Sequence, residues 1–385
     1  MKKLMITALT ICLALTVAGG GVIYASATTE SEKPHIKATS AVLMDYDSGT
    51  VVFTQNEREH LPIASMVKIM TLLLTFEEID AGRLSTEETV RVSEYASSMG
   101  GSQAYLDANC DYVVNELIKS IVVGSANDSC VALAERIAGS VEAFVVKMNE
   151  KAKSLGMLDT NFINCTGLPG LEQYSCAADV AVMSRALYSH PAFFDYSKVW
   201  MFDFTHPSGR ITQLSNTNKL LRAYEGCDGG KTGFTNEAKY CLSATAKRGN
   251  TRLISVVCGA ESSKVRNAQN ATLFNYGFAN YESKQVVVGG NPIEGELEVK
   301  GGKQKTVCAY PEKDCYIFCK RGEESDVEIT VEKFELKAPV NKGDIVGTLK
   351  VTRDGETVES VNLLSDSAVK KATYLDVVDD FIEKW

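Results

Sequence analysis

Strand-like segments at both ends of a long helical region constrain the fold of this chain more than any other feature. Apolar residues 41–44 and 49–53 flank a turn-forming run, which predicts a hairpin. Residues 240–246 and 252–257 have the pattern of two paired strands. The helical patterns between them cover, approximately, residues 65–79, 113–123 and 127–138. This order predicts an α+β domain over residues 37–281, whose first and last segments share one sheet.

The chain has 385 residues, more than one compact core usually holds, so a second domain is expected. The pattern changes after about Glu282. Val327, Ile329 and Val331 alternate with polar residues, and Asp354-Gly355 is a tight-turn pair. We therefore predict a small β-rich domain over residues 282–365, and no catalytic constellation is evident in it.

The first residues have the features of an export signal. A basic start at Met1-Lys2-Lys3 precedes an apolar stretch from Leu4 to about Val17, and Ala25-Ser26-Ala27 fits the small-x-small cleavage rule. We predict a signal peptide over residues 1–27 and a polar linker over 28–36. An uncleaved membrane anchor is the alternative, but the apolar run is short for a spanning helix. Either reading places most of the protein outside the cytoplasm.

The last twenty residues predict an amphipathic helix over 366–385. Apolar side chains recur there at helical spacing and share one face, and acidic residues lie opposite. The apolar set is Tyr374, Leu375, Val378, Phe381, Ile382 and Trp385. Such a helix suits a membrane interface, so we expect this exported chain to attach peripherally to the outer face of a membrane. Docking on the β-rich domain is the alternative.

Charge and cysteine content exclude some classes of function. The formal net charge is −9, which disfavours nucleic-acid binding. The chain has 11 cysteines, and those in apolar runs are interpreted as free core residues. The spacing of Cys308, Cys315 and Cys319 leaves a disulfide open but matches no zinc pattern. We predict no metal and no cofactor.

Ser65-Met66-Val67-Lys68 is the first candidate for chemistry. Three residues of helix place Ser65 and Lys68 on one face, one turn apart. The residues that follow are strongly apolar, and burial lowers the pKa of a lysine so that it acts as a base toward a serine. The start of the helix also offers backbone N–H groups to an oxyanion. Alone the motif is weak, because Ser367-Ala-Val-Lys370 matches it too.

Two further motifs follow in the chain. In Ser125-Ala126-Asn127, the serine can relay a proton and the asparagine can hold a substrate amide from both ends. An ordinary helix cap is its structural alternative. In Lys231-Thr232-Gly233, charge and hydroxyl suit a terminal carboxylate, and glycine permits close approach of a substrate backbone. An ordinary turn before a strand is the alternative here.

The three motifs together, in this order, resemble those of penicillin-binding proteins and serine β-lactamases. Within that group the chain is similar to the low-molecular-mass D-alanyl-D-alanine carboxypeptidases. The segments that carry this likeness are 62–71, Ser125 to Asp128, and 156–168. The layout agrees, with a signal peptide, a transpeptidase-like domain of antiparallel sheet and flanking helices, a small β domain and a terminal helix.

The resemblance implies a mechanism and a substrate. Ser65 attacks the carbonyl between the two terminal D-alanines of a peptidoglycan stem peptide, Lys68 is its base, and Ser125 assists the leaving D-alanine. Asn127 holds the peptide. Lys231 and Thr232, with Arg252, bind the terminal carboxylate. Gly233 admits the peptide backbone, and the backbone N–H groups of Ser65 and Phe234 form the oxyanion hole. β-Lactam antibiotics acylate Ser65. Some relatives have histidine at the position of Phe234, which leaves the backbone N–H in place but puts rate and specificity in doubt.

Three alternatives remain at this stage. A class A β-lactamase needs a deacylating glutamate, and Glu172 lies in the right region but in no convincing motif. An endopeptidase of cross-linked wall peptides shares the same site. A wall-binding scaffold with a dead site is the non-enzymatic reading. The four histidines lie outside the motifs, which excludes a Ser-His-Asp triad.

Overall fold

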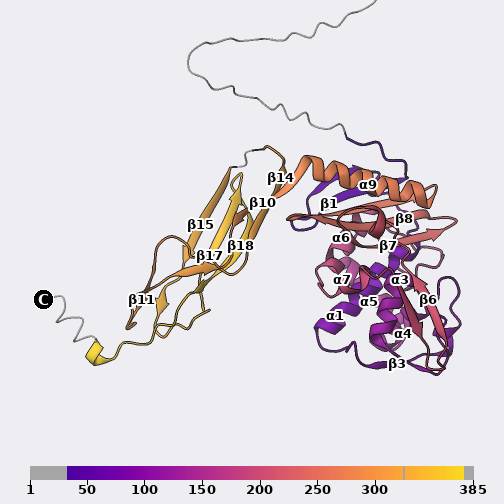
Figure 1. Cartoon of the computed structure of the whole chain (residues 1–385), viewed down its shortest axis with the longest axis horizontal. Coiled ribbons are helices and arrows are strands. Elements are labelled where there is room, and N and C mark those ends of the chain that lie inside the picture. Colours follow the sequence, from indigo (N-terminus) through magenta and orange to yellow (C-terminus); the bar gives the residue numbers. More distant parts are fainter. Residues whose placement is uncertain (1–32, 324–325, 377–385) are drawn as a thin grey trace, which may run out of the picture. The chain divides into compact units, whose positions relative to one another are not determined.

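The computed structural model describes residues 33–323 and 326–376 (Figure 1). The predicted signal peptide, most of the linker and much of the predicted terminal helix lie outside the described residues. Among the described residues, no helix is both long and apolar enough to cross a membrane.

A five-stranded antiparallel sheet organises the first domain, with strand order β2-β1-β9-β8-β7. The strands are β1 (Ser40–Asp45), β2 (Val51–Gln55), β7 (Cys227–Thr235), β8 (Lys239–Arg248) and β9 (Thr251–Ala260). Strand β1 pairs with β9, for example Ala41 with Val257. The predicted sharing of one sheet by the first and last segments is therefore confirmed. The order leaves β7 at an edge, with a backbone row that no strand of this sheet covers.

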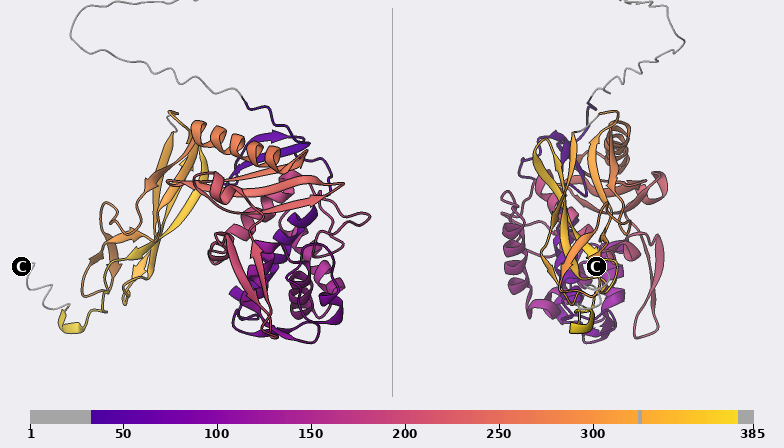
Figure 2. Two further views of the ribbon diagram at one scale, coloured as in Figure 1. Left: turned by 45° about the vertical axis from the view of Figure 1, so that its right-hand side comes forward. Right: turned by 90° about the vertical axis from the view of Figure 1, so that its left-hand side faces the viewer.

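Successive side chains of a strand point to opposite faces of a sheet, and both faces of this sheet are buried. On β1, Leu43 belongs to one apolar core and Val42 to the other. Helix α9 (Ser263–Asn280) covers the first face and packs on β8 and β9. Helix α6 (Ala177–Tyr188) covers the second and packs on β1 and β9. Figures 1 and 2 show this arrangement, an antiparallel sheet with helices on both sides, as predicted.

The helical part of the domain surrounds α1 (Lys68–Asp80), in which every residue from Lys68 to Phe76 is buried. The other helices are α2 (Glu94–Ser97), α3 (Val114–Gly124), α4 (Asn127–Ala138), α5 (Val141–Ser154), α7 (Phe193–Ser197) and α8 (Leu220–Ala223). Two small hairpins complete it, β3 (Thr89–Arg91) with β4 (Asp111–Val113), and β5 (Met201–Thr205) with β6 (Ile211–Ser215).

The helix predicted from Ser65 begins differently in the structure. Residues Ala64–Val67 form a 3₁₀ turn, η1, and the α-helix starts at Lys68. Ala64 has a φ of +47°, a left-handed conformation that stops the helical path before Ser65. The nucleophile candidate therefore lies on a tight turn that leads into a buried helix.

The second domain consists of strands, as predicted. Its sheets have the orders β10-β14, β12-β11-β16 and β13-β18-β17-β15. The strands are β10 (Tyr281–Val287), β11 (Leu297–Lys300), β12 (Thr306–Val307), β13 (Ala309–Pro311), β14 (Cys315–Lys320), β15 (Val327–Lys333), β16 (Leu336–Lys337), β17 (Ile345–Arg353) and β18 (Glu356–Ser365). Most of their buried apolar side chains form a core of their own, whereas Phe318 of β14 belongs to the core that contains Leu43.

The structure of this domain bears on two sequence predictions, the start of the terminal helix and the disulfide. Val369 bridges Val340, and Lys371 bridges Gly302. The first residues of the predicted terminal helix are therefore extended and belong to the β-rich domain, and among the described residues helix begins only at residue 374. The open question of a disulfide is answered within the described residues, where every cysteine is a free thiol.

Candidate active site

The η1 turn brings Ser65 and Lys68 together. The Lys68 Nζ lies 3.0 Å from the Ser65 Oγ and donates a hydrogen bond of 2.5 Å to the carbonyl of Thr166. Ser65 is half-buried, and Lys68 is completely buried. A neutral amine has two hydrogens and one lone pair. The Thr166 carbonyl engages one hydrogen, so the lone pair is available to the Ser65 hydroxyl proton.

Burial holds the pKa of Lys68 below the ordinary lysine value, because removal from water disfavours the ammonium. The core around it contains two buried thiols, Cys130 and Cys165. Burial raises the pKa of the Cys130 thiol to about 12, so it supplies no neighbouring anion. The carboxylate of Asp128 accepts hydrogen bonds from backbone N–H groups of segment 104–106. No carboxylate forms an ion pair with Lys68 in the described residues, and the charge of Asp128 only partly opposes the effect of burial on the Lys68 pKa.

A loop before α6 closes over the nucleophile turn. Gly167 has a φ of +82°, and a Cβ placed there would lie 2.0 Å from the carbonyl oxygen of Ala64. The side chain of Asn164 holds this loop, because its Oδ1 accepts hydrogen bonds from the backbone N–H groups of Thr166 and Gly167. Sequence reasoning assigned no role to this loop, although the glycine lies in the segment that carried the family likeness.

Ser125 reaches the site from the end of α3. It is the C-cap residue, with φ 63° and ψ 32°, a left-handed conformation that is uncommon for a residue other than glycine. Its Oγ accepts a hydrogen bond of 2.8 Å from the Nζ of Lys231. Strain of this kind is often retained where it aims a functional group. Ser125 thus connects the second and third motifs.

Asn127, the first residue of α4, presents an unused acceptor. Its Nδ2 donates to the Gly100 carbonyl at 2.7 Å, and its backbone N–H donates to the Ser102 carbonyl. The side-chain Oδ1 is buried and has no hydrogen-bond partner among the described residues. A buried acceptor without a partner is costly unless a ligand satisfies it, so this oxygen suits a peptide N–H.

The third motif lies on the edge strand β7, which runs beside η1. A Cβ on Gly233 would lie 2.5 Å from the Ile63 carbonyl oxygen, so only glycine permits this close packing. Lys231 is buried, and its pKa is held well below the ordinary lysine value by burial first and by the nearby Lys68 second. An incoming anion offsets both effects. Phe234 is half exposed, with its ring 4.4 Å from that of Tyr240.

Arg252 is not brought to the site. Its guanidinium makes two hydrogen bonds of 2.8 Å to Asp228 and lies over the ring of Phe194. Strand register explains the difference, since Arg252 pairs with Lys247, whereas Lys231 pairs with Ser243. Four residues along β8 separate the two levels, roughly 13 Å of strand. The expected carboxylate role of Arg252 is therefore not supported by its position.

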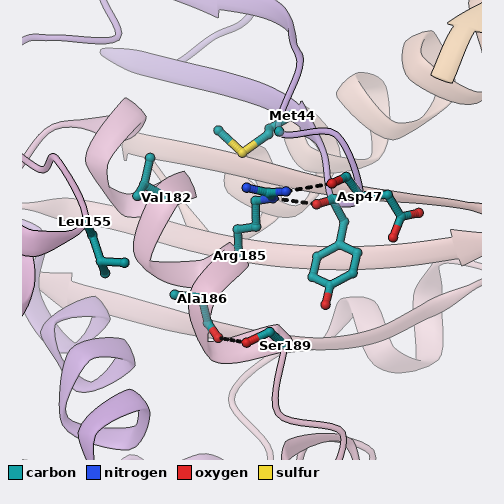
Figure 3. A pocket seen from close by; sticks show the side chains of 9 residues that line it. Met44, Asp47, Leu155, Val182, Arg185, Ala186 and Ser189 are labelled. Carbon is teal, nitrogen blue, oxygen red and sulfur yellow. Dashed lines mark hydrogen bonds between the residues drawn. The ribbon is translucent and has the colours of Figure 1, made fainter. Parts of the chain in front are cut away.

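A separate hollow of about 570 Å³ lies between α6 and the turn after β1 (Figure 3). Its charged residues are Arg185 and Asp47, and the Nε and Nη2 of Arg185 donate at 2.6 Å to the backbone carbonyls of Tyr46 and Asp47. Apolar side chains such as Leu155 and Val182 form much of the rest. Arg185 is engaged in holding the turn, so we interpret this hollow as structural.

The β-lactamase alternative has no structural support in the described residues. Glu172 is exposed, and the hydrogen bond at this residue is made by its backbone carbonyl, which accepts from Asn161. The polar bonds of Lys68 go to Ser65 and Thr166. No glutamate takes part in that network.

A serine beside a buried lysine, a Ser-x-Asn turn and a Lys-Thr-Gly edge strand are the features of active-site-serine, penicillin-binding enzymes. Comparisons with known proteins identify the family. Residues 27–262 match the family described as D-alanyl-D-alanine carboxypeptidase, and residues 281–371 match the penicillin-binding protein 5 C-terminal domain.

Relatives and solved structures agree with these family matches. The chain is 39% identical to the D-alanyl-D-alanine carboxypeptidase DacF of Bacillus subtilis, covering 100% of this chain and 99% of the relative. It is 32% identical to DacA of Escherichia coli, covering 91% and 88%. The crystal structure of penicillin binding protein 5 from Haemophilus influenzae superposes with a TM-score of 0.67 at 32% identity, over 88% of this chain and 99% of that one. The chain therefore belongs to the serine D-alanyl-D-alanine carboxypeptidase family.

Replacing Gly167 tests the role of the loop over the nucleophile turn. We expect Gly167→Ala to slow acylation by a fluorescent penicillin by about a hundredfold, because the methyl group displaces Ala64 and with it Ser65. Gly156→Ala is the matched control. Gly156 has a similar φ of +75°, but no atom lies within 4 Å of its added Cβ. Equal acylation rates in the two folded variants would contradict this account.

Proposed function

We propose that Ser65 is the nucleophile of this carboxypeptidase and Lys68 its general base. The observation that carries the proposal is the 3.0 Å approach of the buried Lys68 amine to the Ser65 hydroxyl. Lys68 takes the hydroxyl proton as the Ser65 Oγ attacks the carbonyl between the two terminal D-alanines. The backbone N–H groups of Ser65 and Phe234 stabilise the oxyanion.

Collapse of this intermediate releases D-alanine and leaves an acyl-enzyme. The departing nitrogen takes a proton from the Ser125 hydroxyl, whose oxygen the Lys231 amine holds at 2.8 Å. The proton that Lys68 took from Ser65 then passes to the Ser125 oxygen, so both Ser125 and the neutral Lys68 amine are restored. Water then attacks the ester carbonyl and gives one proton to Lys68, which passes it to the Ser65 oxygen as the ester bond breaks, so that Ser65 and the neutral amine are restored. A β-lactam enters by the same first step, because its strained amide presents an equivalent carbonyl to Ser65.

Substrate binding uses the edge of β7. An extended stem peptide lies beside this strand, where Gly233 permits close approach of the backbone. The free Oδ1 of Asn127 accepts an N–H of the peptide. Lys231 and Thr232 bind the terminal carboxylate, whose charge compensates the buried amine.

The parts of the chain outside the active site determine where in the cell envelope the enzyme is held. We propose that residues 37–281 form the peptidase domain. Residues 282–365, with the strand residues just beyond them, form a spacer or a partner surface. The amphipathic tail holds the enzyme at the outer face of the cytoplasmic membrane. The spacing of apolar side chains from Tyr374 to Trp385 supports attachment through the tail. The spacer role depends on that attachment.

The activity is tested by D-alanine release from a muramyl pentapeptide by the purified chain without its signal peptide. We expect one D-alanine per peptide, and a loss of roughly a thousandfold or more in Ser65→Ala. Ser367→Ala is the matched control, because Ser367 opens the second Ser-x-x-Lys sequence of the chain. Release by Ser65→Ala at the normal rate would overturn the assignment. Cleavage of cross-linked peptides alone would favour the endopeptidase.

Membrane attachment is tested with a chain that ends at Ala372, which keeps the strand bridges of Val369 and Lys371. We expect the full-length mature chain to sediment with vesicles of phosphatidylglycerol and phosphatidylethanolamine, and the shortened chain to stay in solution with unchanged carboxypeptidase activity. A full-length Phe381→Ala, Trp385→Ala variant serves as the matched control for the apolar face. Equal sedimentation of all three proteins would exclude the tail as the anchor.

A further inference from the structure

The hydroxyl of Thr232 has a partner that the motif analysis did not include. Its Oγ1 donates a hydrogen bond of 2.7 Å to the Oγ1 of Thr217. Thr217 lies in the segment between β6 and α8, outside all three motifs. Its side chain is exposed, whereas Thr232 is almost fully buried. The pair thus extends the polar surface of Lys231 and Thr232 outward.

Two buried asparagines hold Thr217 in place. Asn216 donates through Nδ2 to the carbonyl of Val199 at 2.9 Å, and Asn218 donates through Nδ2 to the carbonyl of Gly229 on β7 at 3.2 Å. The Oδ1 of Asn216 also accepts from the backbone N–H of Asn218. The backbone N–H of Thr217 donates to the Val123 carbonyl, near the end of α3. This frame fixes an exposed hydroxyl between the strand of Lys231 and the helix that ends at Ser125.

The charge of Arg266 acts on the Lys231 amine, whereas three other arginines in this part of the chain are engaged elsewhere. Arg252 is paired with Asp228, Arg210 donates to Asp107, and the guanidinium of Arg222 lies over the ring of Trp200. A carboxylate has two oxygens that together accept several hydrogen bonds. The Lys231 amine already donates to Ser125 and to the Thr232 carbonyl, so hydroxyl donors beside it help to fix the orientation of a carboxylate.

We propose that Thr217 and Thr232 form a two-hydroxyl clamp for the terminal carboxylate of the stem peptide, and that Thr217 is a substrate-binding residue. In the free enzyme Thr232 donates to Thr217, which leaves the hydrogen of Thr217 for the cleft. With substrate bound, each hydroxyl donates to one carboxylate oxygen beside the Lys231 amine. Thr217 therefore contributes to selectivity for peptides with a free C-terminus. This inference rests on the proposed binding of that carboxylate at Lys231 and Thr232.

The clamp predicts an effect on binding of the peptide with little effect on the chemistry. In the purified mature enzyme, we expect Thr217→Val to raise KM for the pentapeptide about tenfold, with kcat within about twofold of wild type, since hydrogen bonds to charged groups are the stronger ones. Thr217→Ser keeps the hydroxyl and is expected to restore KM. Thr272→Val is the matched control, because its hydroxyl bonds the Ala268 carbonyl within α9.

A probe without the carboxylate separates the clamp from general damage. A peptide boronic acid, with boron in place of the penultimate D-alanine carbonyl, has no terminal D-alanine and still bonds to Ser65. We expect its inhibition constant to be unchanged in Thr217→Val. A rise in this constant equal to the rise in KM would overturn the proposal, because the variant would then disturb the whole site.

A double variant separates direct contact from support of Thr232. If Thr217 touches the carboxylate, the Thr217→Val, Thr232→Val enzyme has a higher KM than Thr232→Val alone; equal values would overturn direct binding. A raised KM in Thr232→Val with a normal KM in Thr217→Val would reject the inference and leave the carboxylate site intact. Normal KM values in both variants, with Ser65→Ala still inactive, would reject the carboxylate placement itself.

Discussion

Burial of the Lys68 amine without a carboxylate partner is the interaction on which the rest of the site depends. A charged lysine cannot deprotonate a serine, and an exposed one is charged at neutral pH. The proposed mechanism relies on the position of Lys68 at the first turn of a helix that is buried for its first nine residues, Lys68 to Phe76. The Thr166 carbonyl accepts a hydrogen bond from this amine, whose pKa burial lowers.

The fold supplies two further conditions. The edge position of β7 leaves one side of the Lys-Thr-Gly strand open to an extended peptide, and Gly233 lets that strand pack against the nucleophile turn. The left-handed Ser125 at the end of α3 then joins the Lys231 amine to the site. Residues from α1, α3, α4 and β7 meet here because the helical part and the sheet share one apolar core.

Much of this arrangement was predictable from the sequence, and the exceptions have physical causes. Motif order predicted that Ser65, Lys68, Ser125, Asn127 and Lys231 belong to one site, because residue type determines side-chain chemistry, and the structure brings Ser65 to Lys68 and Ser125 to Lys231. Arg252 was misplaced because strand periodicity gives the face of a side chain but not its level along the neighbouring strand. The role of the Thr166 backbone carbonyl has no sequence signature, since every residue has one. The role proposed for Thr217 depends on its contact with Thr232 in another segment. The two asparagines beside Thr217 are recognisable as its support only once both are seen to be buried.

The most direct test of the central claim is the pKa of Lys68 itself, measured in the folded enzyme by NMR of labelled lysine side chains, with Lys68→Arg used to assign the signal. Because burial disfavours the ammonium, the account predicts a Lys68 resonance that titrates below the range of the exposed lysines and is neutral above that pH. A Lys68 that titrates with the exposed lysines, and is therefore charged at neutral pH, would contradict its role as the base.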